Sequence, residues 1–290
     1  MKDEQVEKFF YWIEERHRIF MKRSRGESWP WTEDKILREY KFTNPFREND
    51  RTTIWFRKNI RDPLRKNPNV LMATVIFRWF NLIQTGETLL KYDLLENWDS
   101  EVAYSVIKPQ DKWITGAYMI KSPTGLDKIQ GINQCINNLW RDKEELIEKF
   151  ESADNLHDMW FRLLGYSHLG GFLSYEVITD LRHTYLGWGA KDIDTWANAG
   201  PGAMRGLNRI WDRPLAYRPK KQPWTYEMVQ LLKLAKERYK IGEFSTANLP
   251  DIYLSNIEMR DIEHSLCEFD KYERVRLGQG RPRSKYERHA

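Results

Sequence analysis

The chain has 290 residues, 41% of them hydrophobic and 31% charged, and a formal net charge of +5. This length can bury a core in one or two domains, and no run of about 18 apolar residues is present to span a membrane. The two isolated cysteines exclude a disulfide framework, and the six scattered histidines form no zinc-type pair. The polar, acidic N-terminus does not resemble a signal peptide, so we expect a cytoplasmic protein with no membrane partner. We also expect the protein to be a monomer.

Helical periodicity dominates the N-terminal half. Apolar spacing predicts a first helix that ends near Arg25-Gly26, and Thr32 is expected to cap a short helix that reaches Tyr40. A polar stretch interrupted by Pro45 follows. Further helical patterns cover residues 54–60, 70–83, 87–92, 99–107 and 126–150, the last with a break near residues 141–142.

The C-terminal half continues the helical pattern. One helix is expected after the cap Asn155, a second from Gly170 to Tyr185, a short third over 192–198 and a fourth after Gly202. Thr225 is expected to cap a helix that reaches Tyr239. A capping box of Ser255 and Glu258 is expected to begin the last helix, which ends at about Arg276. Strand alternation and fixed-period repeats are missing from the sequence. We therefore predict an all-α fold, with one compact multi-helix body over residues 1–273 and a basic tail over 274–290.

A glycine-proline-glycine sequence lies between two of these helices. Gly200 and Gly202 permit positive φ angles and Pro201 fixes its own φ, so the pattern indicates a tight turn. The helix that follows would point its free N–H groups outward, which is a ready anion site. We therefore expect a helix-hairpin-helix at about residues 170–211 that holds a DNA phosphate. The alternative is a plain turn between helices.

The predicted DNA contacts fall in two places. The hairpin would contribute the amides of Gly200, Gly202 and Ala203 and the side chain of Arg205. The basic tail would add phosphate contacts through Arg281 and Arg283, although a tail of this composition is also typical of a disordered segment.

A first polar cluster precedes the middle of the chain. It contains Lys41, Asn44, Arg47, Asp50 and Arg51. If the segment is helical, Arg47 and Arg51 share a face, and two guanidinium groups there could clamp a multiply charged oxyanion such as pyrophosphate. The alternative is a solvated loop with local ion pairing.

Two further clusters carry acids that could exchange protons. Glu176 and Asp180 are spaced to share one side of a largely apolar helix, where burial would raise their pKa values and suit them to act as a general base. Glu268 and Lys271 could form a pair across a site. Either cluster could instead be an ordinary polar helix edge or a surface ion pair.

Several longer segments resemble a known phage family. Residues 30–37, 40–44, 47–51, 196–207 and 261–272 are similar to the alpha-glutamyl/putrescinyl-thymine pyrophosphorylases, whose helical module also occurs fused to phage 5-hydroxymethyluracil DNA kinases. The resemblance runs in order from about Phe9 to Arg274. It implies a transferase of thymidine hypermodification, in which an amine from an amino acid or polyamine displaces pyrophosphate from 5-(pyrophosphorylmethyl)uracil in DNA.

A more distant resemblance, over residues 169–181 and 194–210, is to helix-hairpin-helix DNA glycosylases. The lysine of the bifunctional glycosylases would fall at Met204, and residues 220–221 are lysines where the general-base Asp is expected. This resemblance therefore implies the DNA grip and base eversion rather than cleavage of the glycosidic bond.

These resemblances together assign roles to the clusters. Lys41, Asn44, Arg47, Asp50 and Arg51 would hold the departing pyrophosphate, and Glu176, Asp180, Glu268 or Lys271 would serve the attacking amine. The sequence gives no cofactor with certainty, although Mg²⁺ would suit a pyrophosphate. The alternatives are a non-catalytic DNA-binding subunit of a modification complex and a helix-hairpin-helix glycosylase.

Overall fold

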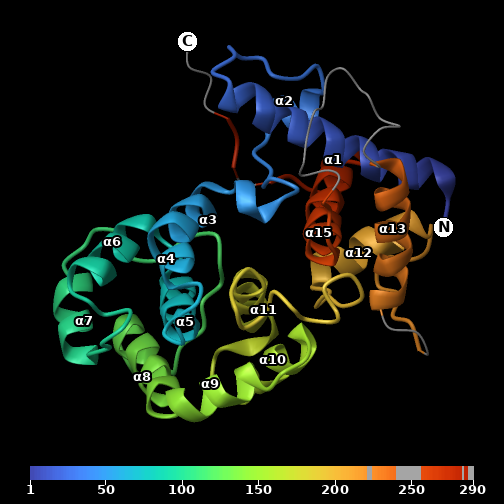
Figure 1. Ribbon diagram of the computed structural model, residues 1–290. Helices are drawn as coiled ribbons and strands as arrows, with labels where there is room; N and C mark the ends of the chain where they lie inside the picture. Colours follow the sequence, from blue (N-terminus) through green and yellow to red (C-terminus); the bar gives the residue numbers. More distant parts are fainter. Residues whose placement is uncertain (221–223, 240–255, 283, 287–290) are drawn as a thin grey trace. The chain divides into compact units, whose positions relative to one another are not determined.

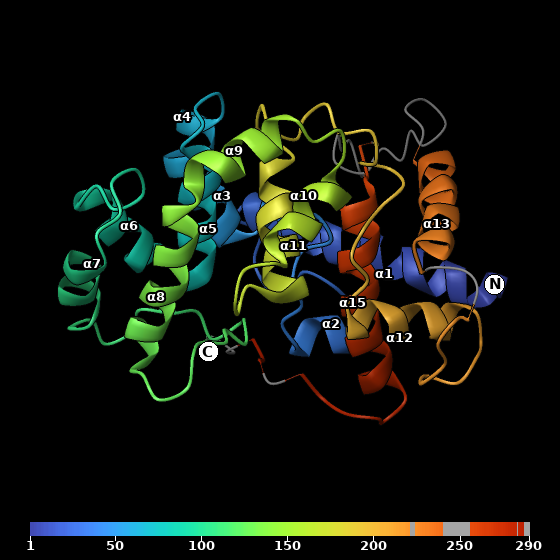
Figure 2. The same ribbon diagram turned by 90° about the horizontal axis from the view of Figure 1, so that it is seen from below.

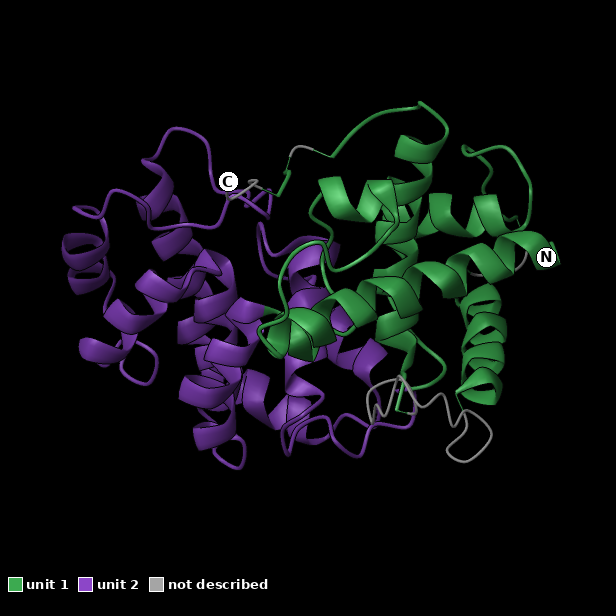
Figure 3. Cartoon of the chain, turned by 90° about the horizontal axis from the view of Figure 1, so that it is seen from above, with its two compact units in different colours: residues 1–50, 194–290 green, residues 51–193 purple. Residues whose placement is uncertain are grey.

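The computed structural model describes residues 1–220, 224–239, 256–282 and 284–286 (Figures 1 and 2). In these residues the fold is all-α, as predicted, and an isolated antiparallel bridge joins Tyr40 to Lys285. The contacts divide the chain into two units (Figure 3): unit 1 contains residues 1–50 and 194–290, and unit 2 contains residues 51–193. The first and last parts of the chain therefore join in one unit.

Unit 1 is built around one long C-terminal helix. Its helices are α1 (Asp3–Ser24), α2 (Lys35–Glu39), the 3₁₀ turn η1 (Arg47–Asn49), α12 (Pro201–Ile210), α13 (Trp224–Arg238) and α15 (Met259–Arg276). α15 contacts α1, α2, α12 and α13. Its apolar residues Ile262, Leu266 and Phe269 are fully buried, and the Phe269 ring meets the Phe9 ring edge-on at a centroid distance of 5.6 Å. α15 therefore positions the other helices of this unit.

The glycine-proline-glycine sequence forms the start of α12. Gly200 has φ −73° and ψ 169°, Pro201 is the first helical residue, and Gly202 lies inside the helix. The tight turn predicted at these three residues is therefore wrong. The glycines serve close packing instead: a Cβ atom on Gly202 would collide with the Cys267 side chain, and one on Gly206 would collide with the backbone of α15 at Leu266.

The helix before this sequence, α11 (Gly170–Leu181), belongs to unit 2. Residues 182–200 between α11 and α12 form turns, so no short hairpin joins the two helices and the helix predicted over 192–198 is absent. The sequence pattern misled here because proline at the first helical position and glycine at a close helix crossing resemble a turn signal.

Unit 2 surrounds an apolar helix, α5 (Val70–Phe80), which is buried along its whole length. The other elements are α3 (Arg51–Phe56), the π-helical η2 (Arg57–Arg61), α4 (Asp62–Leu64), α6 (Ile83–Lys91), α7 (Ser100–Ile107), α8 (Lys128–Arg141), α9 (Lys143–Glu151), α10 (Leu156–Leu163) and α11. α5 packs against α11, α6 and α8. The helix break predicted near residues 141–142 is confirmed between α8 and α9.

The helix caps were predicted with mixed success. The Asn155 side chain accepts the backbone N–H of Asp158 at 2.8 Å and caps α10 as expected. Asp34, not Thr32, caps α2 by accepting the N–H of Ile36 at 2.8 Å, while the Thr32 hydroxyl donates to Glu15. Asp is a better N-cap than Thr, and Thr32 makes a tertiary contact instead.

Two further caps differ from the predictions. α13 is already helical at Trp224, so Thr225 lies inside the helix. Ser255, the predicted cap of the last helix, lies outside the described residues, and Glu258 occupies the N-cap position of α15. Asp261 completes this capping box by accepting the Glu258 N–H at 3.0 Å.

Candidate functional site

A polar face of α15 in unit 1 holds the segment 41–50. Glu268 accepts the backbone N–H of Thr43 with Oε2 at 3.0 Å, and His264 Nε2 lies 2.9 Å from the Thr43 hydroxyl. The residues Asp261, His264 and Glu268 recur at helical spacing, which brings them to one side of the helix. This face therefore fixes the position of Thr43 from two directions.

Glu268 also forms the predicted pair with Lys271. The Lys271 ammonium lies 2.6 Å from Glu268 Oε1 and 5.9 Å from the centroid of the Phe42 ring. Glu268 is buried, so its two oxygens link the lysine to the backbone of the segment 41–50. Glu268 and Lys271 thus contact the segment that carries Lys41, Asn44, Arg47 and Asp50, although the two stretches are far apart in the chain.

Arg16 of α1 contacts the same segment and was not singled out from the sequence. Its Nε donates to the Phe42 carbonyl at 3.0 Å, and the side chain is buried. Desolvation by burial lowers the pKa of Arg16, while nearby Glu268 and Asp50 favour its charged form. Its Nη1 is a buried donor without a hydrogen-bond partner among the described residues. The helical pattern shows Arg16 only as one of several charged residues around the apolar face of α1.

Two buried amides in the segment also have spare hydrogen-bonding capacity. Asn44 donates from Nδ2 to the Asn49 carbonyl at 2.8 Å, which closes the loop around η1. The Asn44 Oδ1 and Asn49 Nδ2 atoms are buried and have no partner among the described residues. Buried polar atoms without protein partners are uncommon, and a bound water, ion or ligand can supply the missing hydrogen bonds.

The remaining members of the first cluster separate. Arg47 lies in η1 and is buried, with an exposed fraction of 8%. Asp50 is extended, with ψ 136°, and ends η1, so Arg51 begins the next helix rather than sharing a helix face with Arg47. The expectation based on a continuous helix is therefore wrong. Lys41 is exposed, and its ammonium lies 5.8 Å from the centroid of the Tyr286 ring.

Asp261 is a titratable group that the sequence reasoning did not select. Desolvation by burial raises the pKa of Asp261 to about 7. The positive charge of Arg260, whose Nε lies 3.8 Å from Asp261 Oδ1, acts in the other direction and lowers this pKa. Arg260 also faces Glu48, at 4.0 Å. Acidic residues in the first turn of a helix are usual, so nothing in the sequence indicates that this one is buried. Its carboxyl group can exchange a proton near neutral pH.

The predicted phosphate grip at the start of α12 has a different environment from the expected one. Gly202 and Ala203 are buried, and the Gly200 N–H donates to Glu263 of α15 at 3.2 Å. A carboxylate of the chain itself therefore lies at this positive helix end. Arg205 is half-buried, and its Nε donates to Asp270 at 2.8 Å.

The second cluster lies in unit 2 and divides into two roles. Asp180 is fully buried and accepts two hydrogen bonds from Arg78 of α5, at 2.6 and 2.9 Å. Arg78 also donates to Asn81 and Thr53, so Asp180 belongs to a buried structural network. Glu176 is half-buried and accepts a hydrogen bond from the Tyr118 hydroxyl.

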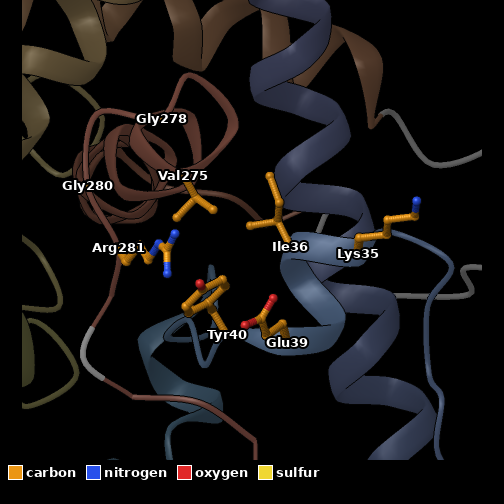
Figure 4. Close-up of a pocket in the computed structure, with 8 residues that line it drawn as sticks. All are labelled: Lys35, Ile36, Glu39, Tyr40, Val275, Gly278, Gly280 and Arg281. Atoms are coloured by element: carbon orange, nitrogen blue, oxygen red, sulfur yellow. The ribbon is translucent and has the colours of Figure 1, made fainter.

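The C-terminal stretch packs on α2 in unit 1. The Tyr286 N–H donates to the Glu39 carbonyl at 3.0 Å, and the Lys41 N–H donates to the Ser284 carbonyl at 2.9 Å. Arg281 lines a cavity of about 400 Å³ between α2 and the end of α15, with Ile36 and Val275 on its apolar walls (Figure 4). Arg283 lies outside the described residues. The described residues of the tail thus pack against the end of α2 and the residue that follows Tyr40.

Two further properties bear on the kind of site. Within the residues that the structure describes, no three His, Cys, Asp or Glu side chains are grouped to hold a metal ion. The described helices include none that is both long and apolar enough to cross a membrane.

Comparison with known proteins assigns the family. The model for the helical domain of the 5-hmdU DNA kinases matches residues 3–281, and the chain therefore belongs to this family of helical domains. A 5-hmdU DNA kinase of Bacillus phage SP10 is 23% identical to it over 290 residues, which cover 91% of this chain and 44% of the relative. The chain thus spans less than half the length of that relative. No solved structure matches.

Proposed function

We propose that this chain is a DNA-modifying enzyme that acts on 5-hydroxymethyluracil-derived bases in phage DNA. Its family membership over residues 3–281 and its similarity to a phage 5-hmdU DNA kinase support this assignment. The more specific proposal is a transferase that replaces pyrophosphate on 5-(pyrophosphorylmethyl)uracil with an amine. The observation that carries it is that Arg16 and Lys271 both lie against Phe42 in the segment 41–50 of unit 1, which itself contains the buried Arg47.

In the proposed reaction the amine nitrogen bonds to the exocyclic methylene carbon of the base. The bond from that carbon to the pyrophosphate oxygen breaks, and the pyrophosphate leaves with the electron pair. Negative charge therefore develops on the leaving oxygen, where a cation in a buried site stabilises the transition state most. Arg16 suits this task, because its guanidinium is held through Nε while Nη1 remains available.

The attacking amine must also lose a proton. Asp180 is poorly suited to accept it, because both carboxylate oxygens are already bound to Arg78. Glu268 lies within the proposed site, and Asp261, with its pKa raised to about 7, can accept a proton at neutral pH. Glu176 of unit 2 remains a second candidate, either as the base or as a carboxylate that binds the ammonium of the donor.

The substrate places further demands on the protein. The target base must leave the helical stack before an enzyme can reach its exocyclic carbon. Lys41 and Asn44 line the segment to which we assign the pyrophosphate, and Arg205 contributes to DNA binding. Mg²⁺ bound to the pyrophosphate would share its negative charge with these cations.

A pyrophosphate-release assay on DNA carrying the activated base tests this proposal. Arg16→Gln should lower the rate about 100-fold or more, since loss of one charge-stabilising donor costs about this much. DNA binding should persist, and Arg16→Lys should retain part of the rate. Arg18→Gln is the matched control, because Arg18 lies on the same helix and pairs with Glu15. An unchanged rate for Arg16→Gln would remove Arg16 from the site.

A second function is a non-catalytic DNA-binding subunit that presents the base to another enzyme. One observation favours it: the relative is named a kinase, and this chain covers only 44% of that protein. Such a subunit would bind the modified DNA but release no pyrophosphate with any amine. A glycosylase would instead leave abasic sites, which alkali converts to strand breaks.

A further inference from the structure

Three arginines of unit 1 share one buried carboxylate at the α12–α15 interface. Arg205 and Arg209 of α12 donate from Nε to the two oxygens of Asp270, at 2.8 and 2.9 Å. The Nε of Arg274, one turn further along α15, lies 3.5 Å from Asp270 Oδ2. Figures 1 and 2 show the two helices side by side.

The charges in this group are not balanced. Asp270 is fully buried and is the one carboxylate that the described residues pair with these three guanidinium groups. Arg209 is buried and makes a second bond, from Nη2 to Gln279 at 2.8 Å. The local formal charge is therefore positive, and mutual repulsion of the guanidinium groups would be relieved by a bound anion.

Two of the three arginines can reach such an anion. The side chains of Arg205 and Arg274 are 36% and 37% exposed, and both approach the same Asp270 oxygen through Nε. Asp270 holds Arg205 through a hydrogen bond and lies at ion-pair distance from Arg274, so the two guanidinium groups are neighbours on partly exposed side chains. A planar guanidinium held in this way is pre-organised to bind phosphate oxygens.

We propose that Arg205 and Arg274 form a clamp for a single phosphate oxyanion, positioned by Asp270. The phosphate is either a phosphodiester of the DNA or the pyrophosphate of the proposed reaction. The clamp differs from the grip expected at the start of α12, because arginine side chains supply the donors instead of helix amides. The clamp proposal rests on the proposed function only for the choice of DNA and pyrophosphate as the two probes.

The test is the salt dependence of duplex DNA binding by the full chain. If both arginines hold one DNA phosphate, Arg205→Gln and Arg274→Gln should each reduce the slope of log K against log salt by up to about 0.9. The double variant should also lose about 0.9 in total, with about fivefold weaker binding at 0.15 M salt. A loss of about 1.8 in the double variant would mean two separate contacts and would overturn the clamp.

A second arm distinguishes the two phosphates. If the clamp holds pyrophosphate, the DNA slope stays unchanged while direct binding of inorganic pyrophosphate weakens at least fivefold in both single variants. Arg276→Gln is the matched control, since Arg276 lies on the same helix, is equally exposed at 36%, and is paired one-to-one with Glu273 at 2.7 Å. Effects equal to this control in both arms would refute the proposal. A protein inactive as a transferase can still pass this binding test.

Discussion

Arg78 and Asp180 form a bidentate ion pair inside unit 2, with side-chain exposures of 1% and 0%. Both Asp180 oxygens accept N–H groups of Arg78, at 2.6 and 2.9 Å. A carboxylate held in this way serves the fold, because its removal leaves a buried guanidinium without its counter-charge.

Asp180→Asn should therefore lower the free energy of unfolding by about 3–5 kcal/mol in urea denaturation. The control is Asp154→Asn, which breaks an exposed pair with Lys191 and should cost at most about 1 kcal/mol. If Asp180→Asn were as stable as the wild type yet inactive, Asp180 would be a proton acceptor and not a structural anchor.

Glu268 links the segment 41–50 to α15 through Thr43 and Lys271. Glu268→Gln keeps an acceptor for the Thr43 N–H but removes the charge that pairs with Lys271. Stability should fall by about 1–3 kcal/mol, as for loss of a buried charged hydrogen bond. Glu145→Gln, at an exposed helical pair with Lys149, should change it by about 0.5 kcal/mol or less. Equal effects of the two variants would mean that Glu268 does not organise the site.

Asp261 should make stability depend on pH. Its pKa is about 7 in the folded chain and near 3.8 when the chain is unfolded, so the folded state binds the proton more tightly. Its contribution to stability is fully present below the unfolded pKa and is lost as pH rises through about 7. Asp261→Asn keeps an acceptor for the Glu258 N–H and should flatten this decline. The measurement is the unfolding free energy of the wild type and of Asp261→Asn from pH 4 to 8. Parallel curves for the two proteins would contradict the raised pKa of Asp261.

Gly206 permits the close approach of α12 to α15. A Cβ at this position would meet the backbone carbonyl of Leu266, which cannot move aside as a flexible side chain could. Gly206→Ala should therefore destabilise the chain by about 1–3 kcal/mol in thermal or urea unfolding. Gly116→Ala is the control, because nothing lies within 4 Å of its added Cβ. An equally small effect at both sites would show that the helix contact is loose.

The sequence predicted the fold class well and the site only in part. Apolar spacing is a local signal, so most helices were found, including the break between α8 and α9. The division into two units depends on contacts between chain ends far apart in sequence, which periodicity does not report. Arg16 and Asp261 were missed for the same reason, because only tertiary packing buries them.

The glycine-proline-glycine sequence shows how a correct local signal can be assigned the wrong structure. Proline and glycine do mark a boundary there, but the boundary is the start of α12, and the glycines are required by the neighbouring helix. Glu268 and Lys271 were correctly paired from their spacing, which is the kind of contact that a helix fixes by itself.

The most direct test of the proposed function is the product of the reaction. DNA that carries 5-(pyrophosphorylmethyl)uracil is incubated with the chain and with single amino acids or polyamines, then digested to nucleosides for mass spectrometry. We predict a thymidine derivative joined to the amine through its methyl carbon, formed together with one equivalent of pyrophosphate. Recovery of the activated nucleoside unchanged with every amine, by a chain that still binds the DNA, would contradict the assignment as a transferase.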